Sequence, residues 1–141
     1  MKNSVKPGKS KFRVLVVDDE SSVLLTYRLI LEQQGYEVTA AISSQEAKDA
    51  IAKQEFDLVL CDYSLEQQHT GFEVISAARA KQPKVPSILL TGYATVETTE
   101  QARKDQIGVM FKPIDIAEFL SSTSAALRNE NESKETSQED K

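Results

Sequence analysis

Short apolar runs rich in β-forming residues alternate along the chain with stretches in which apolar residues recur at helical spacing. Four of the runs are almost continuously apolar, which is typical of strands covered on both faces, whereas the run over 36–41 alternates apolar and polar residues. The alternating run therefore predicts an edge strand. The five predicted strands cover residues 12–17, 36–41, 57–61, 87–91 and 108–111.

Helical patterns lie between and after these strands. Ser21 or Ser22 is expected to cap the first helix, which should end near residue 34 because Gly35 follows. Its inward face is predicted to hold Val23, Tyr27, Ile30 and Leu31. Ser44 is expected to cap the second helix. The other three helices are predicted over about 72–81 and 95–104, and from about 115 onward.

The alternation of five strands with five helices predicts an α/β fold, in which a parallel sheet has helices on both faces and right-handed crossovers. In such sheets, ligands bind beyond the carboxyl ends of the strands, where the winding reverses direction. Polar side chains follow four of the five strands at these ends. They are Asp18 and Asp19 after the first strand, Asp62 after the third, Thr91 at the end of the fourth and Lys112 after the fifth.

The three carboxylates among these residues should repel one another and raise one another's pKa values unless a cation lies between them. Mg²⁺ prefers oxygen ligands, so the sequence DDE (18–20) and Asp62 predict a magnesium site. A carboxylate beside such an ion can attack a phosphoryl group, and a nearby ammonium can neutralise the transferring oxygens. Asp62 is the candidate nucleophile and Lys112 the candidate ammonium.

The same strand ends carry the motifs VVDDE (16–20), LTG (90–92) and FKP (111–113), with Asp62 at the end of a strand. In their order and spacing, these motifs resemble the response-regulator receiver domain of two-component signalling. The resemblance covers about residues 12–128. It implies a flavodoxin-like (βα)5 three-layer sandwich, with a parallel five-stranded sheet of order 2-1-3-4-5.

The resemblance also implies a role for each site residue. Asp62 would be the phosphoacceptor, and Mg²⁺ would be bound by Asp18, Asp19, Asp62 and the backbone carbonyl of Ser64. Thr91 would contact the phosphoryl group and Lys112 would pair with its charge. The peptide bond between Lys112 and Pro113 would be cis, a form that only an X–Pro bond reaches at modest cost.

By the same resemblance, the chain would act as a phosphorylatable receiver in a phosphorelay. The donor would be a histidine kinase or a phosphotransfer protein, and the signal would leave through a surface that binds an unknown downstream protein. We expect no enzymatic activity beyond self-catalysed phosphoryl acceptance and autodephosphorylation. Because no output domain is visible in the sequence, we expect a stand-alone receiver similar to chemotaxis regulators.

The chain departs from the family pattern in the loop after Asp62 and at Val109. The loop after Asp62 usually reads D-x-x-M-P, with a glycine eight positions after the acid, but here it lacks the proline and Gly71 comes nine positions after Asp62. An aromatic residue that turns inward on activation usually stands three positions before the lysine, where this chain has Val109. Tyr93 stands where family members vary in how fast they lose the phosphoryl group.

Charge is uneven along the chain. Residues 1–13 contain five basic residues and no acid, and residues 129–141 contain five acids and two lysines, within a net charge of −5. We expect a disordered basic arm over 1–11, a receiver domain over 12–128 and a disordered acidic tail over 129–141. The single cysteine, Cys61, and the lack of a membrane-length apolar run predict a cytoplasmic protein without a membrane partner. No nucleic-acid partner is expected, because a charge run such as the basic arm is usually a solvated tail.

Three other functions fit the sequence less well than a phosphorylatable receiver. A pseudo-receiver that binds a partner without phosphorylation is disfavoured because Asp19, Asp62 and Lys112 are all present. A magnesium-dependent phosphatase of another α/β fold usually has a second acid two residues after the nucleophile, where this chain has Ser64. Flavin binding is disfavoured because the phosphate loop would be acidic. Cys61 is expected to be a packing residue and His69 a solvated one.

Overall fold

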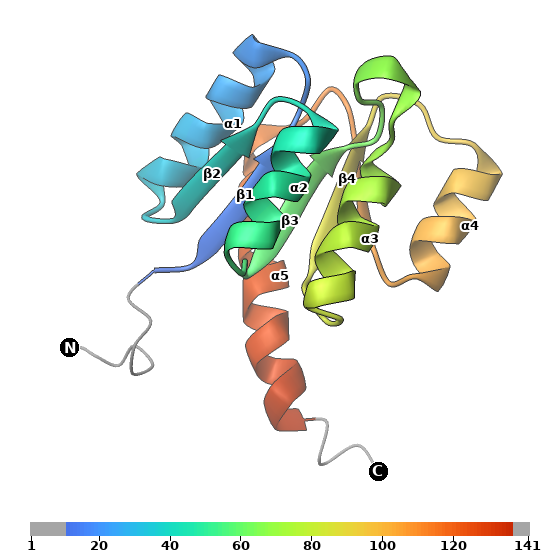
Figure 1. The fold of residues 1–141 in the computed structure, drawn as a ribbon. Helices are drawn as coiled ribbons and strands as arrows, with labels where there is room; N and C mark the ends of the chain where they lie inside the picture. Colours follow the sequence, from blue (N-terminus) through green and yellow to red (C-terminus); the bar gives the residue numbers. More distant parts are fainter. Residues whose placement is uncertain (1–10, 137–141) are drawn as a thin grey trace.

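The computed structural model describes the backbone of residues 11–136 and the side chains of residues 11–128. Strands and helices alternate through this range, as the sequence pattern predicts (Figure 1). The strands are β1 (Arg13–Val17), β2 (Glu37–Ala41), β3 (Leu58–Asp62), β4 (Ser87–Thr91) and β5 (Gly108–Phe111). The helices are α1 (Ser21–Gln33), α2 (Ser44–Lys53), α3 (Gly71–Lys81), α4 (Val96–Lys104) and α5 (Ile116–Thr136), and the short segment η2 (Glu66–Gln68) is a turn with left-handed residues.

All five strands form one parallel sheet in the order β2-β1-β3-β4-β5. This confirms the predicted flavodoxin-like (βα)5 fold and the edge position of the alternating strand, β2. The order reverses direction between β1 and β3, so the carboxyl ends of these two strands lie side by side at the switch point.

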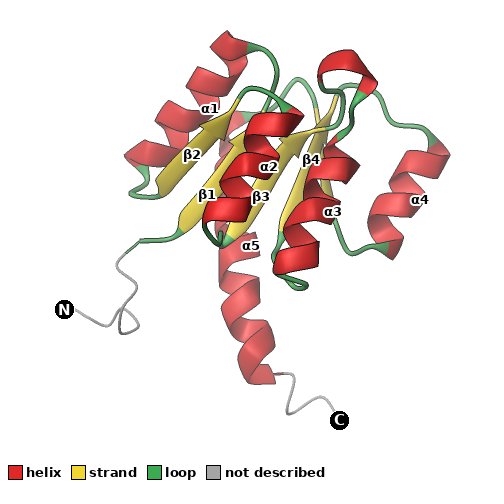
Figure 2. Cartoon of the chain, viewed as in Figure 1, coloured by secondary structure: helices red, strands yellow, loops and turns green. Residues whose placement is uncertain are grey.

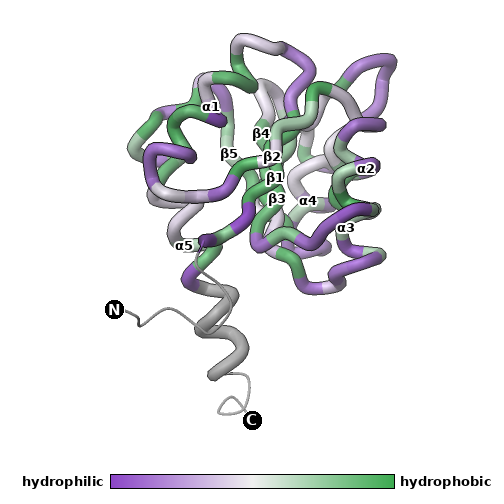
Figure 3. The backbone as a smooth tube through the Cα atoms, turned by 60° about the vertical axis from the view of Figure 1, so that its left-hand side comes forward, coloured by the Kyte–Doolittle hydropathy of each residue, from purple (hydrophilic) through white to green (hydrophobic). Residues whose placement is uncertain are grey.

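Helices cover both faces of the sheet, giving three layers (Figure 2). Alternate residues of each buried strand point to opposite faces. On one face, residues such as Leu15, Val59 and Leu89 pack with α2, α3 and α4. On the other face, Val16, Leu60 and others pack with α1 and α5. The central strands therefore form an apolar band through the molecule, green in Figure 3.

Two predicted helix caps were wrong by one or two residues. The N-cap of α1 is Glu20, whose side chain makes no cap bond, and the carboxylate of Asp18 accepts the backbone N–H of Glu20. In α2 the N-cap is Ser43, whose hydroxyl accepts the backbone N–H of Glu46. Neighbouring serines compete for the same role, so the spacing alone does not decide which one caps.

The inward face of α1 also differs in part from the prediction. Leu24, Tyr27 and Leu31 are its buried residues, whereas Val23 and Ile30 are only partly buried at the margin of the core. The face is therefore rotated slightly from the predicted one. Tyr27 stacks on Phe119 of α5 with ring centroids 5.0 Å apart, which joins the two helices that share this face.

Helix α4 is the most weakly packed of the helices that cover the sheet. Ala102 is its one buried residue, and the rest of the helix is polar or exposed. Figure 1 shows α4 at the right-hand end of the molecule, set apart from α3. This agrees with the polar pattern that the sequence shows over 95–104.

Helix α5 continues to Thr136, past the domain boundary expected at 128. The extra turns are consistent with the absence of Gly and Pro from 129–136, because these residues most strongly disfavour helix. The expected basic arm falls almost wholly outside the described residues, as does the end of the expected tail at 137–141. The division into arm, domain and tail thus stays a prediction. Within residues 11–136, every helix is too short or too polar to span a bilayer.

Candidate functional site

The parallel sheet brings the predicted site residues to one edge. Val17 of β1 pairs with Cys61 of β3, and Thr91 of β4 pairs with Phe111 of β5, so these strands end at nearly the same level. The site therefore brings together residues that are far apart in the sequence. Some of them follow β1 and β5, and the others end β3 and β4. These residues are Asp18, Asp19, Asp62, Thr91 and Lys112.

Three carboxylates form the centre of the site. One oxygen each from Asp18, Asp19 and Asp62 lies within 4.8 Å of the other two. Asp18 and Asp62 are buried, with 1% and 7% of their surfaces exposed, whereas Asp19 is exposed. Such a set of hard oxygen donors, open to solvent on one side, fits Mg²⁺, which retains several waters when bound.

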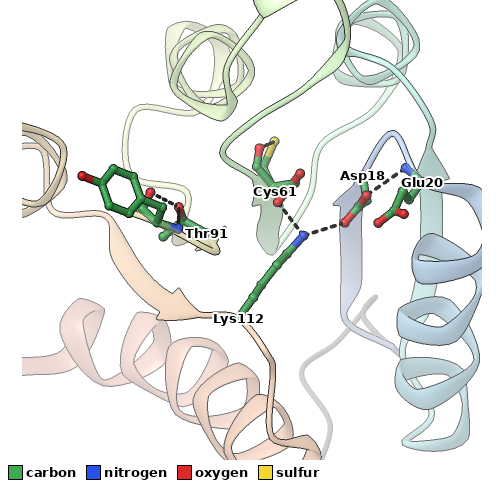
Figure 4. Close-up of polar contacts among 7 residues, drawn as sticks. Asp18, Glu20, Cys61, Thr91 and Lys112 are labelled. Atoms are coloured by element: carbon green, nitrogen blue, oxygen red, sulfur yellow. Dashed lines mark hydrogen bonds and ion pairs between the residues drawn. The ribbon is translucent and has the colours of Figure 1, made fainter. Parts of the chain in front are cut away.

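Lys112 supplies the positive charge of the cluster (Figure 4). Its Nζ lies 2.8 Å from Oδ1 of Asp62 and 3.5 Å from Oδ2 of Asp18. The backbone N–H of Lys112 donates to the carbonyl of Thr91 at 2.8 Å, which ties the end of β5 to β4. The Lys112–Pro113 peptide bond is cis, as the resemblance implies.

Burial is the main perturbation at Asp62. It raises the pKa of this carboxyl, and the hydrogen bond and charge of Lys112 only partly oppose that effect. Repulsion from Asp18 and Asp19 adds to the increase, so the predicted rise in pKa is present at Asp62 but stems more from burial than from repulsion. Burial also disfavours the Lys112 ammonium, but Asp62 and Asp18 outweigh it and raise the pKa of Lys112.

Thr91 is buried at the end of β4, and its hydroxyl is engaged with the segment that follows. Oγ1 donates to the carbonyl of Tyr93 at 2.7 Å and accepts the backbone N–H of Tyr93 at 3.2 Å (Figure 4). A phosphoryl group on Asp62 would have to compete with these two bonds for the hydroxyl. Tyr93 itself is 78% exposed.

The loop between β3 and α3 returns to the site through Gly71. A Cβ atom on Gly71 would lie 2.6 Å from the carbonyl oxygen of Asp62 and 2.7 Å from Cδ2 of Leu89, so this close approach requires glycine. The extra residue of the loop is thus accommodated before Gly71. Ser64, whose carbonyl is an expected metal ligand, is exposed in this loop and forms an isolated antiparallel bridge with Thr70.

The sequence reasoning missed one polar contact beside the site. The carboxylate of Glu66, in the β3–α3 loop, accepts hydrogen bonds from the backbone N–H and the hydroxyl of Ser44 at the start of α2. The sequence clue to this contact was the missing loop proline, because Glu66 occupies the position where the family pattern has proline. Cys61 is buried as expected, and burial raises the pKa of its thiol well above the ordinary value, so the thiol stays protonated.

Comparison with known proteins gives a consistent result. Residues 14–124 match the family model of the response regulator receiver domain. The transcriptional regulatory protein ZraR of Escherichia coli is 32% identical over 115 residues, which are 81% of this chain and 26% of that protein. The alginate biosynthesis transcriptional regulatory protein AlgB of Pseudomonas aeruginosa is 36% identical over 90 residues, or 64% of this chain and 20% of that protein. The chain thus spans about a quarter or less of the length of these relatives.

Solved structures show the same fold. A CheY-like response regulator receiver domain protein from Methanospirillum hungatei superposes with a TM-score of 0.82 at 29% identity, covering 87% of this chain and 98% of that one. The chemotaxis protein CheY4 of Vibrio cholerae gives a TM-score of 0.77 at 27% identity, covering 83% and 99%.

The raised pKa of Asp62 leads to a prediction about stability without metal. In buffer containing a chelator, Asp62→Asn should melt at a higher temperature than the wild type at neutral pH, because the folded site disfavours the ionised carboxyl. A raised pKa means that the folded state binds this proton more tightly than the unfolded chain does, so wild-type stability falls as the pH rises through that pKa. The advantage of the variant should therefore shrink as the pH is lowered through the pKa of Asp62.

Thermal melts between neutral and acidic pH measure this difference. The matched control is Asp49→Asn, which removes an exposed aspartate of α2 that contacts Gln45 and lies outside the cluster. Its melting temperature should stay close to that of the wild type at neutral pH. A neutral-pH melting temperature of Asp62→Asn below that of the wild type would contradict the interpretation.

Proposed function

The chain belongs to the family of response regulator receiver domains, and we propose that it is a phosphorylatable receiver that accepts a phosphoryl group on Asp62. The observation that carries this proposal is the buried Asp62 carboxylate, held 2.8 Å from the Lys112 ammonium within a cluster of three acids. We infer that Asp62 is the carboxylate that reacts and that all three carboxylates would hold a cation.

In the proposed reaction, an oxygen of Asp62 forms a bond to phosphorus as the bond between phosphorus and the donor histidine nitrogen breaks. The electron pair of the broken bond stays on the imidazole, which takes a proton from solvent. Lys112 neutralises charge on the phosphoryl oxygens, and the Thr91 hydroxyl donates to one of them after leaving the carbonyl of Tyr93. Attack of water on the same phosphorus later returns the carboxylate and inorganic phosphate.

Asp18, Asp19, Asp62 and the backbone carbonyl of Ser64 would hold Mg²⁺, which when bound supplies positive charge against the incoming phosphoryl oxygens. The burial of Asp18 supports this assignment, because a carboxylate that is 1% exposed requires compensating charge and Lys112 is 3.5 Å away from it. These ligands are all hard oxygen donors, which Mg²⁺ prefers, so we propose Mg²⁺ as the cofactor.

The donor would be the phosphohistidine of a histidine kinase or of a phosphotransfer protein, and the phosphorylated domain would bind a downstream protein. Two of the relatives are transcriptional regulatory proteins that are much longer than this chain. Their role in transcription is therefore not assigned to the present protein. The phosphatase alternative finds little support, since Ser64 stands where such enzymes have their second acid.

Phosphoryl transfer from a small donor tests the proposal. Incubation with acetyl phosphate and Mg²⁺ should add one phosphoryl group to the wild type, as measured by intact mass, and none to Asp62→Asn. Omitting Mg²⁺ should abolish the addition, because phosphate charge is then uncompensated. Asp49→Asn, which changes an exposed aspartate outside the cluster, should be labelled as the wild type is. Equal labelling of Asp62→Asn and the wild type would refute the assignment of the phosphoacceptor.

The signal is proposed to leave the site through the segment after β4. Val109, which stands where the family has an inward-turning aromatic residue, is partly buried against the core and as a β-branched residue has one preferred rotamer. By contrast, Thr91 is directly bonded to the backbone of Tyr93, and the following helix α4 has only Ala102 buried. Moving the Thr91 hydroxyl would therefore change the structure of residues 91–98 more than that of β5.

Amide chemical shifts with and without beryllofluoride, a phosphoryl mimic, measure this response. We expect large changes over 91–98 and small changes over 107–111. Tyr93→Ala keeps the backbone bonds to Thr91 but removes the ring, so it should preserve the location of the changes. Changes centred on 107–111 in both proteins would instead show that β5, including the exposed Phe111, carries the signal.

A further inference from the structure

The loop between β3 and α3 is a small hairpin, which we call the β3–α3 hairpin (residues 63–71). The backbone N–H of Gly71 donates to the carbonyl of Tyr63 at 2.8 Å, and the N–H of Leu65 donates to the carbonyl of His69 at 2.9 Å. Ser64 pairs with Thr70 between these bonds. Because the hairpin starts directly after Asp62, its shape fixes the backbone next to the site.

The turn of this hairpin is unfavourable for its residues. The N–H of His69 donates to the carbonyl of Glu66 at 3.0 Å, and the two residues between them, Gln67 and Gln68, have φ angles of 53° and 67°. Two successive left-handed residues are typical of a type I′ turn, which strongly prefers Asn-Gly. Glutamine adopts this conformation at a cost, so contacts outside the turn must hold the hairpin in place.

The strongest such contact joins the hairpin to α2. The two carboxylate oxygens of Glu66 each lie 3.2 Å from the backbone nitrogen of Ser44, and one lies 2.7 Å from the Ser44 hydroxyl. Ser44 is buried in the first turn of α2, where unpaired N–H groups and the helix dipole favour a carboxylate. The side chain of Leu65, also in the hairpin, is buried in the core.

We propose that Glu66 is a positioning residue for the metal site, acting through the backbone of Ser64. Glu66 lies two residues after Ser64 and joins the strained hairpin to α2 by hydrogen bonds. In this way it holds the Ser64 carbonyl where it can bind Mg²⁺. This inference rests on the proposed function, in which that carbonyl is a ligand. Mg²⁺ demands near-ideal octahedral geometry, so a carbonyl on a mobile loop would bind it poorly.

The contact also explains how this chain tolerates the missing proline. Proline restricts the backbone by its ring, whereas Glu66 restricts it by hydrogen bonds to a neighbouring helix. The hydrogen bonds of Glu66 can be removed by a side-chain substitution that leaves the backbone chemistry unchanged, so their effect can be tested. Partners of metal ligands typically change metal affinity by about tenfold or more when they are lost.

The test is a Mg²⁺ titration of isotope-labelled protein, followed by amide shifts and by the ¹³C shift of the Ser64 carbonyl. Glu66→Ala should weaken Mg²⁺ binding by about tenfold, with the Ser64 carbonyl shift moving only at the higher Mg²⁺ concentrations. Glu66→Gln keeps an oxygen acceptor for Ser44 and should bind Mg²⁺ nearly as the wild type does. Glu32→Gln is the matched charge control, because Glu32 is exposed in α1 and pairs with Arg28, away from the hairpin.

A rescue distinguishes positioning from general loss of structure. Replacing Gln67 and Gln68 with Asn and Gly relieves the turn, so adding this pair of changes to Glu66→Ala should restore Mg²⁺ affinity toward the wild-type value. If Glu66→Ala does not fold, Ser44→Ala removes only the hydroxyl contact and should weaken binding in the same direction.

The outcomes separate this inference from the proposed function. Wild-type affinity in Glu66→Ala, with the Ser64 carbonyl shift moving as in the wild type, would refute positioning by Glu66 and leave the metal site intact. Loss of affinity that the Asn-Gly turn does not restore would also refute it. If Mg²⁺ shifts no signal of Asp18, Asp19 or Asp62 in the wild type, the proposed metal site itself is wrong, and this inference falls with it.

Discussion

The ion pair between Lys112 and Asp62 is the contact on which the arrangement of the site depends. Among the described side chains, Lys112 is the only basic group paired with Asp18 or Asp62, and it faces a cluster of three carboxylates. One ammonium does not balance three carboxylates, and burial makes the ionised form of Asp62 more costly, which raises the pKa of this carboxyl. The folded domain therefore holds a surplus of carboxylate over ammonium groups at a fixed place, and this negative surplus favours binding of a divalent cation there.

The parallel sheet supplies the rigidity that keeps these charges together. Each of the central strands β1, β3 and β4 is buried on both faces, so its carboxyl end is held by two apolar cores. Repulsion within the cluster is opposed by the packing of the whole domain, because separating the acids would require moving strands. The parts that remain adjustable are the β3–α3 hairpin and the segment from Thr91 to α4, which depend on a few polar contacts.

The sequence predicted those features that follow from periodicity and topology. Continuous apolar strands define a doubly covered parallel sheet, and that sheet alone brings Asp18, Asp62 and Lys112 to one edge. Features that depend on tertiary contact were not predictable in the same way. The bond of Glu66 to Ser44 joins residues from separate elements, and the Thr91 hydroxyl turns to the Tyr93 carbonyl because the backbone after β4 folds back. In α2, Ser43 caps the helix through the N–H of Glu46, whereas the hydroxyl of the adjacent Ser44 bonds to Glu66.

The central claim is that the negative surplus at the strand ends makes cation binding and phosphoryl binding interdependent. Calorimetric titration of Mg²⁺ into the protein, with and without beryllofluoride, measures that coupling directly. Coupling free energies between bound ligands commonly correspond to about 5- to 150-fold changes in affinity. The account predicts that beryllofluoride raises Mg²⁺ affinity by at least about tenfold and that beryllofluoride does not bind when Mg²⁺ is removed. Equal Mg²⁺ affinity with and without beryllofluoride would contradict it.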